Sequence, residues 1–291
     1  MAEDAAAGHS GGVELTRPAH WRAGVILASP HSGRDYPPWF LAESVLDPLA
    51  LRSSEDAYVD RLIAPAVAAG AVTLAARVPR VVVDLNRGPE DLDPAAIDGL
   101  PPRRLDARIL SGLGVVPRVV ARGRPIRHGK LSEAEARRRI EAYWRPYHAA
   151  LAAVVDEAVA TFGRAVLIDV HSMPREALSH LNAPRPDIVL GDRNGASADP
   201  GVSARVHGAL TGAGFRVRRN SPFAGAFVAA AYGRPGQNRH VVQIEIDRGL
   251  YLDEAMVRPH AGYAGFADRF ARVVAELAGI APAAPGRIAA E

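Results

Sequence analysis

Residues 165–172, Ala165-Val166-Leu167-Ile168-Asp169-Val170-His171-Ser172, combine an apolar run with a histidine near its end. A second run, Gly24-Val25-Ile26-Leu27-Ala28, is followed shortly by His31. Short uninterrupted apolar runs are typical of strands that are buried on both faces of a sheet. Open α/β sheets bind ligands at the carboxyl ends of their strands. We therefore expect His31 and His171 at one edge of a central sheet.

The segment Asp84-Leu85-Asn86-Arg87 lies between these two runs in the chain. An arginine offers a bidentate fork to a carboxylate, and an asparagine amide adds a further donor. Arg80 falls on the same face as Asn86 if residues 80–85 form a regular strand, and it could then stabilise an oxyanion. This order of motifs indicates a metal hydrolase whose substrate has a free carboxylate, although any single arginine is more often part of a surface ion pair.

A catalytic zinc site typically has three protein ligands and an open position for water, whose pKa the metal lowers to about 7. The chain has no cysteine, so its metal ligands must be nitrogen and oxygen atoms. His31 and His171 are the best imidazoles, and Glu55 and Asp56 are adjacent carboxylates. Neighbouring residues on a helix face about 100° apart, so we expect only one to coordinate and we prefer Asp56. The alternative for Asp56 is a charge at a helix N-terminus.

Two more carboxylates stand within apolar strands. Glu245, in Gln243-Ile244-Glu245-Ile246-Asp247, would be buried at a cost unless it is paired or used, which favours a general base beside the metal. Asp169 shares a strand face with His171, so it could orient the imidazole, polarise bound water or accept a hydrogen bond at the strand end.

Strands and helices alternate along the chain, which predicts a three-layer α/β/α domain. We expect helices over residues 56–69, 132–162, 199–210 and 253–277, with a capping box at Ser132 and a break near Arg145 caused by Pro146. We expect further strands over residues 72–76, 80–85, 187–190 and 241–246. The segment over residues 88–117 is too long for a plain connection between two elements, and its length predicts a functional loop or lid. The predicted organisation comprises a disordered arm over residues 1–18, one domain over 19–281 and a tail over 282–291.

The composition supports one large globular domain, with 291 residues, 48% hydrophobic and 23% charged. There is no apolar run of membrane-spanning length and no secretory signal pattern, so we expect a cytoplasmic protein without a membrane partner. The pI near 9.5 accompanies a formal charge of only +3 and basic side chains spread along the chain, so we expect no nucleic-acid partner. The oligomeric state stays open.

Several blocks in one order resemble the N-formylglutamate amidohydrolase family, also called N-formylglutamate deformylases, over residues 25–275. The blocks are Ser29-Pro30-His31-Ser32-Gly33, residues 54–60, Arg80 through Arg87, residues 145–148, Asp169-Val170-His171-Ser172-Met173-Pro174, Gly191-Asp192-Arg193, residues 220–225 and Gln243 through Tyr251. The resemblance implies a fold like that of zinc carboxypeptidases and aspartoacylases, with a mixed sheet between helical layers. Two positions depart from the family pattern: Ala226 stands in place of a glycine and Arg127 in place of an aromatic residue.

The resemblance also implies roles for individual residues. It assigns one zinc ion, or alternatively another divalent metal, to His31, Asp56 and His171, with Glu55 and Asp35 as alternative carboxylates. It makes Glu245 the general base, and Arg80 the residue that polarises the substrate carbonyl. It assigns substrate binding to Asn86, Arg87, Asn220 and Arg248. The implied reaction is hydrolysis of N-formyl-L-glutamate to formate and L-glutamate, as in histidine degradation. The alternatives are a zinc amidohydrolase or carboxypeptidase for another N-acyl amino acid or short peptide, and a non-catalytic carboxylate-binding protein.

Overall fold

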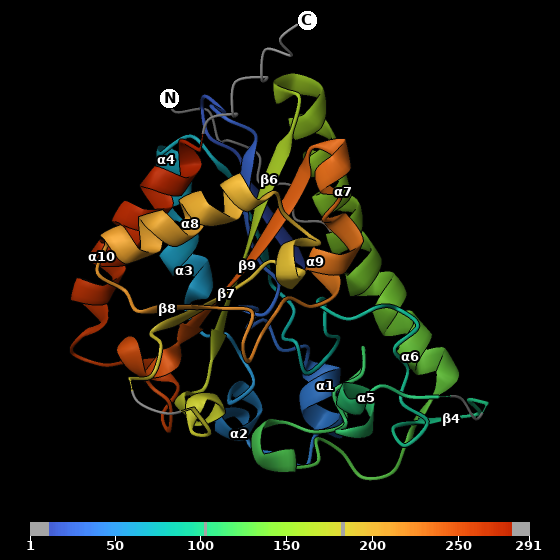
Figure 1. The fold of residues 1–291 in the computed structure, drawn as a ribbon. Helices are drawn as coiled ribbons and strands as arrows, with labels where there is room; N and C mark the ends of the chain where they lie inside the picture. Colours follow the sequence, from blue (N-terminus) through green and yellow to red (C-terminus); the bar gives the residue numbers. More distant parts are fainter. Residues whose placement is uncertain (1–11, 102–103, 182–183, 281–291) are drawn as a thin grey trace, which may run out of the picture.

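A sheet of seven strands forms the centre of the computed structural model, which describes residues 12–101, 104–181 and 184–280 (Figure 1). The strand order is β1-β3-β2-β6-β9-β7-β8. Strands β3, β2, β6 and β9 are parallel, whereas β1 pairs antiparallel with β3 and β7 with β9, so the sheet is mixed. The strand bounds are β1 Val13–Thr16, β2 Val25–Ser29, β3 Val72–Ala76, β6 Ala165–Met173, β7 Ile188–Gly191, β8 Val217–Arg219 and β9 Arg239–Asp247.

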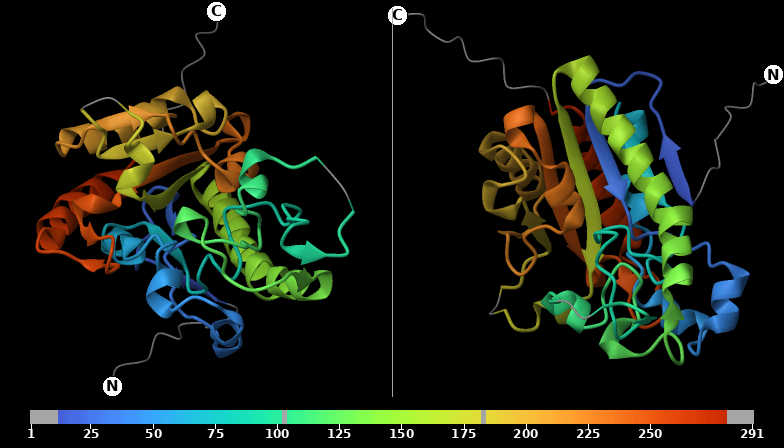
Figure 2. Two further views of the ribbon diagram at one scale, coloured as in Figure 1. Left: turned by 90° about the horizontal axis from the view of Figure 1, so that it is seen from below. Right: turned by 90° about the vertical axis from the view of Figure 1, so that its right-hand side faces the viewer.

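Helices cover both faces of this sheet (Figures 1 and 2). Successive strand side chains point to opposite faces, and Leu167 and Ile168 of β6 accordingly belong to two different apolar cores. The first core contains α7 (Arg145–Phe162) and α9 (Phe227–Tyr232). The second contains α3 (Val59–Ile63), α4 (Pro65–Ala68), α8 (Pro200–Gly212) and α10 (Tyr263–Ala278). The predicted three-layer α/β/α architecture is confirmed.

The middle of the sheet is the pair β6 and β9. Their register runs without interruption from Ala165 opposite Arg239 to Met173 opposite Asp247. Every residue of β6 is buried, and so is every residue of β2 on its other side. Because these strands are parallel, their carboxyl ends meet at one edge of the sheet, and the polar residues that end each apolar run are brought together there.

Short helices, two small ribbons and 3₁₀ turns complete the fold, and Figure 1 shows several of the short helices below the carboxyl edge of the sheet. The short helices are α1 Pro38–Glu43, α2 Pro48–Arg52 and α5 Ala107–Leu110. Two small ribbons pair β4 (Ile97–Asp98) with β5 (Leu131–Ser132) and β10 (Leu252–Asp253) with β11 (Arg258–Pro259). Single 3₁₀ turns are η1 Ala121–Gly123, η3 Arg175–Leu178, η4 Arg193–Gly195, η5 Pro235–Gln237 and η6 Arg248–Leu250.

The long helix begins where the sequence predicts. Ser132 Oγ accepts a hydrogen bond from the Glu135 amide at 3.2 Å, although the Glu135 carboxylate pairs with Arg138 and Arg139 and does not close the capping box. The expected break near Arg145 is instead a π-helical turn, η2 Ile140–Trp144, between α6 (Glu133–Arg139) and α7. The wider turn accommodates Pro146, which has no backbone N–H to donate.

Three element predictions are wrong. Residues 80–85 form no strand, although residues 81–85 are buried, because the Val82 amide turns back to the Pro79 carbonyl. The helix expected over residues 56–69 begins at Val59, after a left-handed Tyr58, and is divided at Pro65 into α3 and α4. The closing helix begins at Tyr263, because the preceding residues form the β10 and β11 ribbon.

The predicted disordered arm over residues 1–18 is wrong for residues 13–16. These residues form β1, whose backbone pairs with β3 and whose Val13 side chain is buried against the core. Residues 1–11 and the predicted tail over 282–291 lie outside the described residues. Asp199 caps α8 with Pro200 in its first turn, as predicted. Among the described residues no helix is long and apolar enough to span a membrane.

Candidate metal centre and active site

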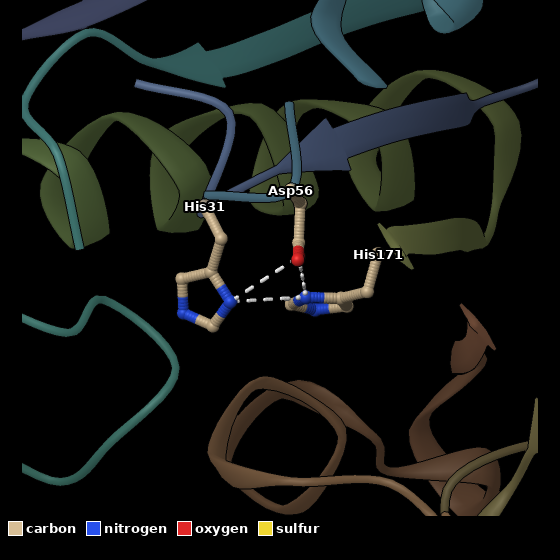
Figure 3. Close-up of side chains that lie close together, drawn as sticks. All are labelled: His31, Asp56 and His171. Atoms are coloured by element: carbon tan, nitrogen blue, oxygen red, sulfur yellow. Dashed lines mark hydrogen bonds and ion pairs between the residues drawn. The ribbon is translucent and has the colours of Figure 1, made fainter. Parts of the chain in front are cut away.

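Three buried side chains from three segments converge at the carboxyl edge of the sheet (Figure 3). His31 follows β2, His171 lies near the end of the neighbouring strand β6, and Asp56 lies in the loop that precedes α3. The Asp56 amide also donates to the His31 carbonyl at 2.9 Å, which fixes the loop against the first histidine. The structure therefore brings together all three residues that the sequence predicts as metal ligands.

The spacing of their ligand atoms fits a metal ion. His31 Nδ1 and His171 Nδ1 are 3.1 Å apart, and Asp56 Oδ2 lies 2.9 Å from His171 Nδ1 and 3.4 Å from His31 Nδ1. Tetrahedral zinc with bonds of about 2.0–2.1 Å would place its ligand atoms about 3.3 Å apart. The trio could therefore bind a metal with only small side-chain adjustments.

A carboxylate holds the outer nitrogen of each imidazole. His31 Nε2 lies 2.7 Å from Asp84 Oδ1, and His171 Nε2 lies 3.0 Å from Asp169 Oδ2. If each Nε2–H donates to its carboxylate, each Nδ1 presents a lone pair to the other Nδ1 and to Asp56. Such lone pairs repel one another unless a cation lies between them, and a carboxylate behind each histidine is the usual support of a metal site.

Asp84 is the principal site residue to which the sequence assigned no role. Burial opposes ionisation of Asp84, but the positive charge of Arg80 and the contact with His31 hold its pKa well below the usual range. Arg80 donates to Asp84 Oδ2 at 2.7 Å, while the other oxygen faces His31. The apolar residues before Asp84 resemble those before Asp169, and this likeness was the available signal.

Asn86 contacts protein groups with both ends of its amide. Its Oδ1 accepts from the Val228 amide at 2.7 Å, and its Nδ2 donates to Asp169 Oδ2 at 3.3 Å, close to His171. The sequence predicted that this amide binds a substrate carboxylate. In the structure the loop that carries Asn86 turns inward toward β6, and the role of Asn86 in substrate binding stays a prediction.

Arg87 has the features of an anion-binding side chain. It is buried, and its Nη2 has no hydrogen-bond partner among the described residues. Its Nη1 lies 3.7 Å from Asp106 and 3.9 Å from Asp91, which are weak contacts. Burial lowers the pKa of Arg87, and Asp84 opposes this shift. A buried guanidinium with an unused donor is costly, so this group is suited to a carboxylate ligand.

Glu245 faces the metal trio from β9. It lies directly opposite His171 in the β6 and β9 register and is buried. Burial raises the pKa of Glu245, and the neighbouring Asp56 carboxylate raises it further, against the opposing effect of His171. Gln243 donates to Glu245 Oε1 at 2.8 Å and accepts from the Ala226 amide, so one carboxylate oxygen is held and the other is available.

Three of the four remaining predicted residues are held away from the trio. Asp35 pairs with Arg77 and is largely exposed, and Glu55 accepts from Tyr36 and Arg52, so neither carboxylate joins the trio. Asn220 binds the turn around Asp192 and does not face the histidines. Arg248 was expected in the substrate pocket and does line the cavity beside the site, while its guanidinium donates to Asp56 and to other protein groups.

A cavity of about 470 Å³ leads to this centre. Arg80 and Asp84 line the cavity, together with Leu113 and Pro117 from the predicted loop over residues 88–117. Its lining also includes residues 119–123, which form the turn around η1. The predicted functional loop therefore lines the approach to the site and also contains β4 and α5.

Residues 23–252 match the family model described as N-formylglutamate amidohydrolase. The chain belongs to the N-formylglutamate amidohydrolase family. It is 35% identical to an N-formylglutamate deformylase of Pseudomonas aeruginosa over 260 residues, covering 88% of this chain and 91% of that one. A deformylase of Pseudomonas putida is 34% identical over 241 residues, covering 80% and 83% of the two chains.

The fold also matches solved structures of related proteins. An N-formylglutamate amidohydrolase from Ralstonia eutropha JMP134 superposes with a TM-score of 0.86 at 37% identity, covering 92% of this chain and 97% of that chain. The gene product Atu2144 of Agrobacterium tumefaciens gives a TM-score of 0.67 at 17% identity, covering 92% and 95%, and shares the fold. The predicted family is confirmed, and with it the assignment of the chain to an amidohydrolase enzyme family.

Proposed function

We propose that this protein is a zinc-dependent hydrolase that converts N-formyl-L-glutamate to formate and L-glutamate, acting in histidine degradation in the cytoplasm. The observation that carries the proposal is the convergence of His31, Asp56 and His171 opposite the buried carboxylate of Glu245. The relatives named as N-formylglutamate deformylases support the substrate. The nitrogen and oxygen donor set and its spacing support zinc.

The metal would be held by His31, Asp56 and His171. A zinc ion bound there would polarise the formyl carbonyl and make a water molecule acidic near neutral pH. The buried carboxylate of Glu245 would accept a proton from the attacking water and return a proton to the departing nitrogen. The water oxygen bonds to the formyl carbon, the carbon to nitrogen bond breaks, and the products are formate and the free amine.

Two arginines would complete the site. Arg80 lines the cavity beside Asp84, where it would stabilise the developing oxyanion. Arg87 would bind a substrate carboxylate through its unpartnered Nη2, and Asn86 would hold Asp169, the carboxylate behind His171. Because N-formyl-L-glutamate carries two carboxylates and no other charge, buried cationic donors are suited to select it.

Formate release from N-formyl-L-glutamate tests the proposal. The substrate is supplied to the zinc-reconstituted protein, with a chelator-treated sample as control and a panel of other N-acyl amino acids for comparison. We expect rapid, chelator-sensitive release with N-formyl-L-glutamate preferred. Faster turnover of another N-acyl amino acid would identify that compound as the substrate instead. If a folded, zinc-loaded protein turned over none of these compounds, the result would favour a non-catalytic carboxylate-binding protein.

A further inference from the structure

Arg248 donates four hydrogen bonds to protein groups around the metal trio. It lies in η6, directly after β9, and its side chain is 8% exposed. Its Nη2 donates to Asp56 Oδ1 at 2.8 Å and to the Ser172 carbonyl at 3.2 Å. Its Nε donates to Ser172 Oγ at 3.0 Å, and its Nη1 donates to the Ser53 carbonyl at 3.1 Å. The guanidinium thus connects the ends of β6 and β9 to the loop that carries Asp56.

The two oxygens of Asp56 have different partners. Oδ2 faces the two imidazoles, whereas Oδ1 faces away and accepts from Arg248 and, at 3.4 Å, from Ser172 Oγ. We propose that Arg248 is the positioning residue that keeps Asp56 a single-oxygen metal ligand. This inference rests on the metal site of the proposed function and concerns how that site is held.

The geometry of the side chain explains why an arginine is used here. A planar guanidinium can donate in several fixed directions at once, whereas a lysine ammonium is a point charge on a flexible stem. Without the bond to Arg248, the Asp56 carboxylate would be free to rotate or to approach the metal with both oxygens. The bond to Ser53 O also fixes the backbone just before Asp56, so the loop and the carboxylate are restrained together.

The charge of Arg248 and its hydrogen bonds have opposite effects on metal affinity. A positive guanidinium beside a metal site repels a divalent cation, so the charge alone would lower the affinity for the metal. Arg248→Lys keeps the charge and removes the fork, whereas Arg248→Met removes both. If positioning dominates, both variants bind zinc more weakly than the parent protein; if charge dominates, Arg248→Met binds it more tightly.

The test measures zinc affinity of the full chain by competition with a chromogenic chelator. Groups that support metal ligands typically contribute 10- to 100-fold to metal affinity, so we expect Arg248→Lys to weaken zinc binding by about that factor. Arg175→Lys is the matched control, because Arg175 donates to the neighbouring Asp247 at 3.1 Å and is half exposed. We expect this control to stay within about twofold of the parent affinity.

The outcomes separate the inference from the function on which it rests. Parent-like zinc affinity in Arg248→Lys, or tighter binding in Arg248→Met, overturns the positioning role while the metal site stands. Parent-like affinity in Asp56→Asn overturns the metal site itself. If Arg248→Lys and Arg248→Met do not fold, Arg248→Gln carries the test, because a glutamine side chain is polar but lacks the charge and the fork that donates to Asp56; parent-like zinc affinity in that variant also refutes the positioning role.

Discussion

Glu245→Gln removes the proposed general base while changing little else in the site. Glutamine has nearly the same shape, and its side-chain oxygen can still accept the hydrogen bond that Gln243 donates to Oε1 at 2.8 Å. Glu245 is not one of the three residues whose ligand atoms converge for a metal. The substitution should therefore abolish proton transfer without removing the metal or unfolding the sheet.

The expected size of the effect follows from the role. A positioned general base contributes about 10²- to 10⁴-fold to a rate, which corresponds to about 3 to 5 kcal/mol in the activation barrier. Because Glu245 is buried and lies opposite His171, bulk water cannot easily replace it, and we expect a loss toward the upper end of this range. The loss should appear in kcat, with KM little changed.

The assay is formate release at saturating zinc, together with the metal content of each variant. Glu55→Gln is the matched control, because Glu55 is also a buried carboxylate but is held by Tyr36 and Arg52 away from the trio. We expect the control to retain activity within a few-fold and both variants to retain zinc. A Glu245→Gln protein with more than a tenth of the parent kcat would refute the assignment of the base.

Four further predictions concern the metal support, the substrate, pH and the core. Asp84→Asn should weaken zinc binding by about 10- to 100-fold in a competition titration, because it removes the carboxylate behind His31; unchanged affinity would contradict this. Arg87→Met should raise KM for N-formyl-L-glutamate at least tenfold in steady-state kinetics, since it removes a buried donor. An unchanged KM would show that another group binds the substrate carboxylate. Burial raises the pKa of Glu245, and a protonated carboxyl accepts no proton, so kcat/KM should fall as the pH drops through that raised pKa; a profile that stays flat down to about pH 4.5 in folded protein would argue against it. Phe270→Ala should lower the free energy of unfolding by about 3 to 5 kcal/mol in urea titrations, because Phe270 is fully buried in the core on the α10 side, and a loss below about 1 kcal/mol would contradict that packing.

The sequence-based predictions were most accurate for polar residues that follow or interrupt an apolar strand. His31 and His171 follow short apolar runs that are typical of buried strands, and parallel pairing of those strands brings the two imidazoles together. Glu245 was identified for a similar reason, because a carboxylate within an alternating apolar strand needs a use. The divergence of neighbouring helical side chains indicated that only one of Glu55 and Asp56 would coordinate, and the structure separates the two carboxylates, although Asp56 lies in a loop.

The failures share a physical cause, which is that loop paths are not encoded in local pattern. Residues 80–85 have strand-like composition, but the turn at Pro79 bends them out of the sheet. The same path turns Asn86 inward to Asp169 and presents Asp84 to His31. Arg248 lies close to the site as expected, yet its hydrogen-bond partners come from residues 53, 56 and 172, and no short-range rule predicts them.

The central claim is that His31, Asp56 and His171 hold a metal that is required to hydrolyse N-formyl-L-glutamate. The most direct measurement follows formate release while zinc is stripped from the protein and then returned in counted equivalents. The account predicts that activity is lost on stripping and returns in proportion to zinc until one equivalent is bound, and that Asp56→Asn fails to recover under the same titration. Full activity in metal-free protein, or recovery by Asp56→Asn that matches the parent, would contradict it.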